Sequence, residues 1–205
     1  KPMDFDSTKR YPVIAYVYPG PWTEYIPLDF EFSSPSGAPQ LAQLGFVVVC
    51  FGNRGGSPYR GRDYHCYGYG NLRDYPLADN KYGLEQLIAR YSFIDGTKVG
   101  IFGHSGGGSM TVAAICTYPD FYKAAVASSG NYDNTIFDYG WSEIHHGIKE
   151  VTKEGKVSFE FSIPVHLELA KNLKGHLMLV TGDADDTVNP ANTSRMVHSL
   201  ILAGK

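Results

Sequence analysis

The sequence predicts an α/β fold in which a mostly parallel sheet carries helices on both faces. Apolar, β-rich runs alternate along the 205 residues with segments of helical character. This alternation is typical of parallel strands that are connected by helices. One of the runs leads through a glycine-rich segment at 103–108 directly into an apolar helical segment. No internal repeat or low-complexity tract interrupts the pattern, so a single domain is expected.

The predicted elements follow one another in chain order. Apolar, β-rich runs are the predicted strands, at 13–18, 46–51, 99–102, 124–127 and 176–181. Between them lie the predicted helices, at 39–44, 78–91, 109–116, 165–172 and 191–203. The second of these is long and amphipathic, and the third is stopped by Pro119.

In the last predicted helix, an apolar stripe is expected to face the core. Its members are Met196, Val197, Leu200 and Ile201, whereas His198 lies off the stripe and is expected to be solvated.

Composition narrows the possible partners. The chain is 43% hydrophobic and 19% charged, as is ordinary for a soluble globular domain. Its net charge of −3 and lack of a basic cluster argue against nucleic acid, and no apolar run has transmembrane length. The three cysteines have no metal-ligand spacing, and neither a metal nor another cofactor is predicted.

The glycine-rich segment contains the pattern G-x-S-x-G, formed by Gly103, Ser105 and Gly107. In a sharp strand-to-helix turn, a Cβ at either outer glycine would collide with its neighbours, and the serine hydroxyl stands clear of the sheet. Such loops also cradle phosphate, but no Gly-Lys-Ser/Thr follows and the spacing is not G-x-G-x-x-G. The pattern favours a nucleophilic serine, with a purely structural glycine turn as the alternative.

A nucleophilic serine needs a histidine base and a carboxylate that orients this base. On scaffolds with this elbow, the acid follows the serine in the chain and lies in a loop after a later strand. The segment 181–188 follows the predicted strand at 176–181 and fits this place. Three aspartates compete there, Asp183, Asp185 and Asp186.

These motifs make the chain resemble the catalytic domain of the prolyl oligopeptidase family, especially its dipeptidyl peptidase IV-like branch. The resemblance rests on G-H-S-G-G at 103–107 and G-x-x-D-D-x-V at 182–188, with further matches at 11–14, 16–21, 53–57 and 93–95. It covers nearly the whole chain and implies an α/β-hydrolase fold for residues 1–205. It also implies that Asp185, the first aspartate of the pair, is the triad acid, and leaves Asp183 and Asp186 as solvated charges or caps.

The resemblance further implies an oxyanion hole formed by the Tyr18 hydroxyl and the backbone N–H of Gly106. Each preorganised donor aimed at the developing negative oxygen lowers the barrier by roughly 3 to 4 kcal/mol. Without the resemblance, a tyrosine at a strand end is commonly a packing residue. Family members often carry a tyrosine where this chain has Gly106. This change alters a wall of the site but leaves the backbone N–H that would donate to the oxyanion.

In relatives, aromatic residues after the strand that follows the elbow helix line a small apolar pocket suited to proline. The matching segment, 131–143, departs from the usual run of tyrosines. Phe137 and Trp141 are four residues apart, can share one helix face, and are the candidates for the pocket. Core packing of the same pair is the alternative.

The wider segment 131–162 breaks the alternation and is predicted to be an insertion over the carboxyl edge of the sheet. It either supplies walls for a substrate or forms a solvated excursion. His145 and His146 within it are predicted to be surface or loop residues, because no ligand set with metal spacing accompanies them.

The base is not evident in the sequence. After Asp185 the remaining histidine is His198, within a predicted helix, and His104 points away from its neighbour Ser105 across the tight elbow. The other histidines considered precede the acid and match no family position: His65, His166 and His176. In the family the base lies in a loop after one further strand.

We therefore expect a truncated catalytic domain that lacks the C-terminal strand, the histidine loop and the N-terminal β-propeller of the family. Without its base, a triad loses activity on the order of a millionfold, so the chain by itself is expected to be nearly inactive.

The function predicted for the full-length protein is that of a serine peptidase that cleaves short peptides after Pro or Ala near the N-terminus through an acyl-enzyme. The alternatives are an esterase or acylaminoacyl peptidase on the same fold, and a non-catalytic interaction domain. Peptides are the expected substrates. The resemblance also suggests a homodimer and a bacterial periplasmic or other extracytoplasmic location.

Overall fold

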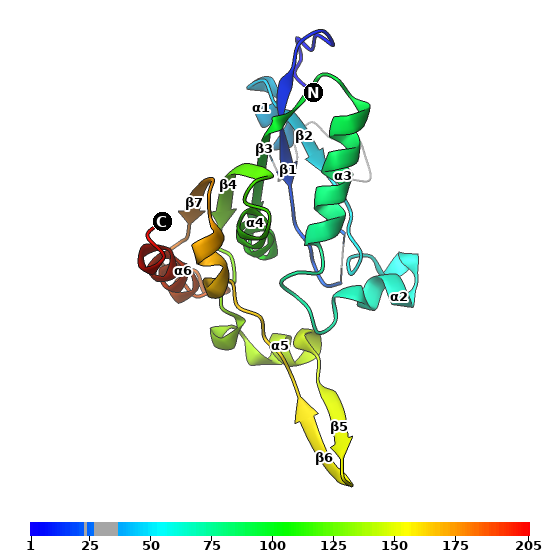
Figure 1. Ribbon diagram of the computed structural model, residues 1–205, viewed down its shortest axis with the longest axis vertical. Helices are drawn as coiled ribbons and strands as arrows, with labels where there is room; N and C mark the ends of the chain where they lie inside the picture. Colours follow the sequence, from blue (N-terminus) through cyan, green and yellow to red (C-terminus); the bar gives the residue numbers. More distant parts are fainter. Residues whose placement is uncertain (23, 27–36) are drawn as a thin grey trace.

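A five-stranded parallel sheet forms the centre of the fold. The computed structural model describes residues 1–22, 24–26 and 37–205 (Figure 1). The strands are β1 (Tyr11–Tyr16), β2 (Val47–Cys50), β3 (Ile94–His104), β4 (Tyr122–Ser128) and β7 (His176–Val180), in the order β2-β1-β3-β4-β7. All neighbouring strands pair in parallel, so the predicted α/β fold is confirmed.

Helices follow most of the strands. The α-helices are α1 (Ala38–Gln43), α2 (Arg62–His65), α3 (Leu77–Arg90), α4 (Gly106–Thr117), α5 (Tyr139–His146) and α6 (Ala191–Leu202). Short 3-10 helices lie at Pro58–Arg60, Cys66–Gly68, Asn134–Ile136 and Leu167–Asn172. In the described residues, no helix is both long and apolar enough to cross a membrane.

The core lies between one face of the sheet and α4. Residues whose side chains alternate onto this face are almost completely buried, such as Val13, Ala15, Val99 and Ile101. Every residue of α4 from 107 to 116 is also buried. A helix that is apolar all round belongs in the interior, and its burial fixes the position of the turn that precedes it.

The segment predicted as a helix at 165–172 is instead a 3-10 helix at Leu167–Asn172. With three residues per turn, Leu167, Ala170 and Leu173 lie on one side, and all three pack against the core. Leu169, which lies off this line, also packs against the core.

The stripe predicted on α6 is partly wrong. Val197 and Ile201 are 40% and 66% exposed, while the buried side carries Asn192, Thr193 and Met196. Polar contacts set this rotation, because the Asn192 Oδ1 atom accepts from the backbone N–H of Asp133 at 2.9 Å. The predicted exposure of His198 is confirmed.

The inserted segment 131–162 has two structurally different halves. Its first half contains α5, and its second half is an antiparallel hairpin of β5 (Lys149–Lys153) and β6 (Lys156–Glu160). The hairpin projects away from the sheet at the bottom of Figure 1, and nearly all its residues are exposed. The solvated excursion, one of the two alternatives for the segment, therefore describes the hairpin alone, because the first half contains buried residues such as Asn131, Ser142 and His146.

The prediction that His145 and His146 are surface or loop residues is wrong for His146, whereas His145 is half-buried. Both lie on the last turn of α5, and His146 is only 4% exposed. The helix packs against the segment before α3, where the Gly70 N–H donates to the His145 carbonyl at 3.2 Å. Nothing in the local sequence indicated this distant neighbour.

Candidate active site

The turn between β3 and α4 holds Ser105 in a backbone conformation that is rare for a residue with a side chain. Ser105 has φ 56° and ψ −121°. Such a conformation costs about 1–3 kcal/mol and persists only where surrounding contacts enforce it. Here the Ser105 N–H donates to the Ser128 carbonyl at 2.8 Å, and its own carbonyl accepts from the Ser109 N–H at 3.0 Å. The turn is therefore pinned to β4 on one side and to α4 on the other.

The glycines around Ser105 are required by close backbone contacts, as the sequence predicted for two of them. A Cβ at Gly103 would lie 2.5 Å from the Val17 carbonyl oxygen, and one at Gly107 only 2.0 Å from the same atom. Gly108 has an equally strict requirement, since its Cβ would lie 2.4 Å from the Ser128 carbonyl oxygen. That third contact was missed because it depends on the packing of β4.

Replacing Gly107 with alanine is expected to destabilise the protein by about 3 kcal/mol, because the Val17 carbonyl is backbone and cannot move aside cheaply. For a domain of this size, this corresponds to a fall of roughly 6–12 °C in melting temperature. Gly106→Ala is the matched control, since its Cβ would meet Pro19 O at 3.5 Å, an ordinary contact. Equal melting temperatures of the two variants in a thermal scan would contradict the packing described for the elbow.

The candidate side chains come together because the carboxyl ends of parallel strands share one edge of the sheet. Tyr18 follows β1, Ser105 follows β3, and the loop with Asp185 follows β7. A further bond joins the residue after β4 to the end of β7, just before this loop, since the Ser129 N–H donates to the Val180 carbonyl at 2.8 Å.

Among the three candidate aspartates, Asp185 is the one held by the surrounding structure. Its Oδ1 atom accepts from the backbone N–H groups of Val188 at 2.9 Å and Thr187 at 3.1 Å. The Val188 amide, followed by the Ser129 hydroxyl, lowers the pKa of the Asp185 carboxyl below its ordinary value. A carboxylate held in its ionised form near the elbow is suited to orient a histidine.

Asp183 and Asp186 are exposed in the same loop. Asp186 accepts a hydrogen bond from the Thr187 hydroxyl at 3.2 Å. Their positions fit the solvated charges that the sequence allowed.

Across residues 1–22, 24–26 and 37–205, no histidine nitrogen is within hydrogen-bonding distance of Ser105 Oγ. The ring of His104 lies instead with Nδ1 3.1 Å from Ser128 Oγ, in agreement with the expectation that it points away from Ser105.

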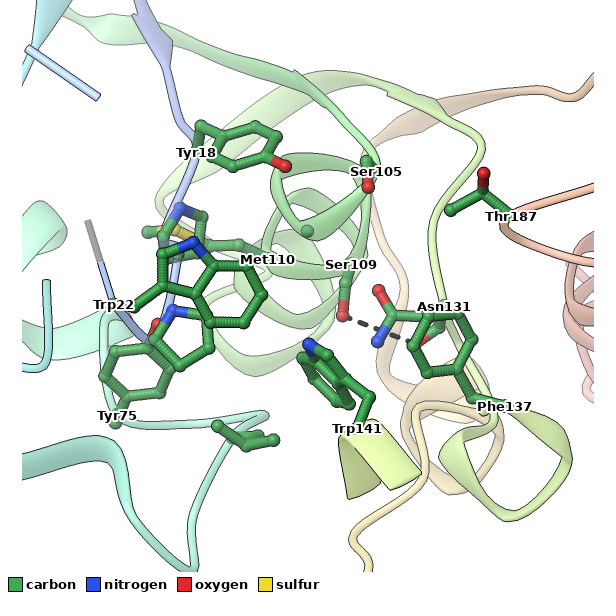
Figure 2. A pocket seen from close by; sticks show the side chains of 15 residues that line it. Tyr18, Trp22, Tyr75, Ser105, Ser109, Met110, Asn131, Phe137, Trp141 and Thr187 are labelled. Carbon is green, nitrogen blue, oxygen red and sulfur yellow. Dashed lines mark hydrogen bonds between the residues drawn. The ribbon is translucent and has the colours of Figure 1, made fainter. Parts of the chain in front are cut away.

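A cavity of about 240 Å³ opens beside Ser105 (Figure 2). Tyr18 and Gly106 line it, and the Tyr18 hydroxyl points towards Ser105. The amide of Gly106 belongs to the first turn of α4, whose N–H groups have no partner within the helix. Both predicted oxyanion donors therefore lie next to the serine.

Phe137 and Trp141 also line this cavity, with ring centroids 5.2 Å apart and planes at 90°. The expectation that they share a helix face is wrong, because α5 begins at Tyr139 and Asp138 is its N-cap. The Asp138 carboxylate accepts from the Trp141 N–H at 2.7 Å. The two rings therefore meet across the start of the helix.

Several lining residues were not predicted. Trp22, Leu72 and Tyr75 come from loops after β1 and before α3, where no periodic pattern identifies them. Ser109 and Met110 come from α4 and could have been found, since residues four and five positions after Ser105 project from the next turn of the helix.

The chain is similar in sequence and in structure to known proteins. The prolyl oligopeptidase family pattern matches residues 32–205. Human dipeptidyl peptidase 8 is 30% identical over 205 residues, which are 100% of this chain and 22% of the relative. The crystal structure of Porphyromonas gingivalis dipeptidyl peptidase 4 superposes with a TM-score of 0.85 at 27% identity, and covers 100% of this chain and 28% of its own. A Bacteroides ovatus candidate dipeptidyl aminopeptidase IV gives 0.87 at 29% identity, with the same coverage. The chain thus spans about a quarter of the length of these relatives.

Proposed function

Since the chain belongs to the prolyl oligopeptidase family of serine peptidases, we propose that Ser105 is the nucleophile of a dipeptidyl peptidase. The full-length protein would cleave short peptides after Pro or Ala near the N-terminus. The observation that carries the proposal is the strained Ser105 turn at the mouth of the cavity, with Asp185 anchored on the same edge of the sheet. The relatives named above are dipeptidyl peptidases, which supports the same reaction class.

The proposed reaction uses Ser105, Tyr18 and Gly106 of this chain together with a histidine base. Ser105 Oγ attacks the scissile carbonyl while a histidine takes its proton. The Tyr18 hydroxyl and the Gly106 N–H donate to the carbonyl oxygen as it becomes negative. The histidine then passes the proton to the leaving amine, and water hydrolyses the acyl-enzyme by the same steps.

In this mechanism Asp185 accepts from the histidine and stabilises the imidazolium that forms. Because no histidine of this chain contacts Ser105 Oγ in the described residues, we place the base outside residues 1–205. We propose likewise that these residues are part of a hydrolase domain, with the rest of the full-length protein restricting access to short peptides.

The test compares three substrates on the full-length protein: an Xaa-Pro p-nitroanilide with a free amino terminus, its N-acetylated form, and a short-chain p-nitrophenyl ester. We expect the amide with a free amino terminus to give a higher kcat/KM than its N-acetylated form, because a dipeptidyl peptidase recognises the amino terminus. Turnover of the ester without turnover of either amide would contradict the proposal and favour the esterase alternative. Preference for the blocked amide would favour an acylaminoacyl peptidase.

A further inference from the structure

One wall of the cavity beside Ser105 is polar, although aromatic rings dominate the rest. Ser109 lies one turn after Ser105 on α4, about 6 Å further along the helix axis. In Figure 2 a dashed line joins its hydroxyl to the Asn131 carbonyl, directly above Trp141 in this view. A side chain that enters the cavity from a carbonyl at Ser105 would bring its tip to this level.

A buried histidine behind the wall fixes the direction of the Ser109 hydroxyl. His166 is 0% exposed, with Nδ1 3.1 Å from the Tyr132 carbonyl oxygen and Nε2 3.0 Å from Ser109 Oγ. Burial lowers the pKa of His166 to about 4, so the ring is neutral near pH 7 and carries one N–H. A carbonyl can only accept, so that proton lies on Nδ1, and Nε2 accepts the hydrogen of Ser109.

This arrangement leaves two acceptors side by side with no donor. Ser109 Oγ lies 3.4 Å from the Asn131 carbonyl oxygen, but its single hydrogen is directed to His166 at the shorter distance. The side-chain amide of Asn131 donates to Asn134 Oδ1 at 2.6 Å. Among the described residues, no other donor reaches either oxygen. Buried acceptors without a donor are unfavourable, so a group that supplies one is stabilised there.

We propose that Ser109 Oγ and the Asn131 carbonyl form a subsite that accepts a hydrogen bond from the tip of the substrate's P1 side chain, the residue that supplies the scissile carbonyl. The enzyme would then prefer a ring-bearing P1 residue with an O–H donor over the same ring without it. The proposal rests on the proposed function, since it assigns a P1 pocket to the cavity beside Ser105.

The size of the cavity supports a ring at this position. An apolar protein cavity of about 150 Å³ binds benzene, and the cavity here has about 240 Å³ with Trp22, Phe137 and Trp141 among its walls. Tyrosine and 4-hydroxyproline both combine a ring with a hydroxyl donor. Phenylalanine and proline are the matched residues that lack it.

The experiment measures kcat/KM of the full-length protein on two pairs of dipeptidyl amides, with P1 proline against 4-hydroxyproline and P1 phenylalanine against tyrosine. We expect the hydroxylated member of at least one pair to be preferred about tenfold, the effect of one buried hydrogen bond. Ser109→Ala should reduce this ratio to near one. Thr111→Val is the matched control, because its hydroxyl is also buried on α4 but does not line the cavity, and it should keep the preference.

The outcomes separate the subsite from the function on which it rests. If the kcat/KM ratios of both pairs were near one while turnover was normal, the subsite would be overturned and the proposed peptidase function would stand. A water molecule that bridges Ser109 Oγ and the Asn131 carbonyl oxygen predicts that result. A preference that survives Ser109→Ala would also overturn it. Absence of turnover on every amide would overturn the proposed function and the subsite together.

Discussion

Ser105→Ala is expected to lower kcat of the full-length protein on Xaa-Pro amides by about a millionfold, the loss found when a triad serine is removed from another serine protease. Alanine keeps the size of the Cβ but removes the oxygen that would form the acyl bond. The oxyanion donors and the pocket remain, so a small residual rate above that of uncatalysed hydrolysis in water is expected. Initial rates measured at high enzyme concentration would detect it.

Ser194→Ala is a suitable control for this change, because Ser194 is exposed on α6 and does not line the cavity. We expect it to keep the parent kcat. If the Ser105 variant also kept that rate, the assignment of the nucleophile to the elbow would be wrong.

Asp185→Asn is expected to reduce kcat by about 10⁴-fold, as in a serine protease whose triad aspartate was changed to asparagine. The amide oxygen can still accept from the Val188 and Thr187 N–H groups, so the loop keeps its conformation. The amide nitrogen, however, is a donor and favours the wrong histidine tautomer. The variant therefore tests the charge and proton acceptance of Asp185 separately from its structural role.

The neighbouring aspartate provides the control for that measurement. Asp186→Asn removes one exposed negative charge from the same loop and should leave kcat within about twofold, because exposed charges interact weakly. A larger loss from Asp186→Asn than from Asp185→Asn would transfer the role of the acid to Asp186.

The parts of the molecule that could be predicted from sequence are those set by local physics. Apolar runs recur where strands are buried, and each of the five central strands overlaps its predicted run, although β3 begins at Ile94, five residues before the run at 99–102. The elbow was predictable because G-x-S-x-G is a short pattern that can be recognised in the sequence, although the contact that requires glycine at 103 and 107 is with the distant Val17 carbonyl. The loop of Asp185 was found for a similar reason, since it directly follows a recognisable strand.

The remaining parts depend on contacts between distant segments. Trp22 and Tyr75 reach the cavity from loops without a periodic pattern, and the bond between Ser109 and His166 joins residues 57 positions apart. The rotation of α6 follows from a contact with Asp133, which no pattern within the helix reports. Such features arise from tertiary packing, which overrides local preference.

The most direct test of the proposed nucleophile is covalent labelling of the full-length protein with a fluorophosphonate. This reagent forms a bond from its phosphorus to an activated serine oxygen and releases fluoride. Peptide mapping by mass spectrometry should place a single adduct on Ser105 in the parent protein and none on the Ser105→Ala variant. An adduct on another residue, or equal labelling of parent and variant, would contradict the assignment of Ser105 as the catalytic serine.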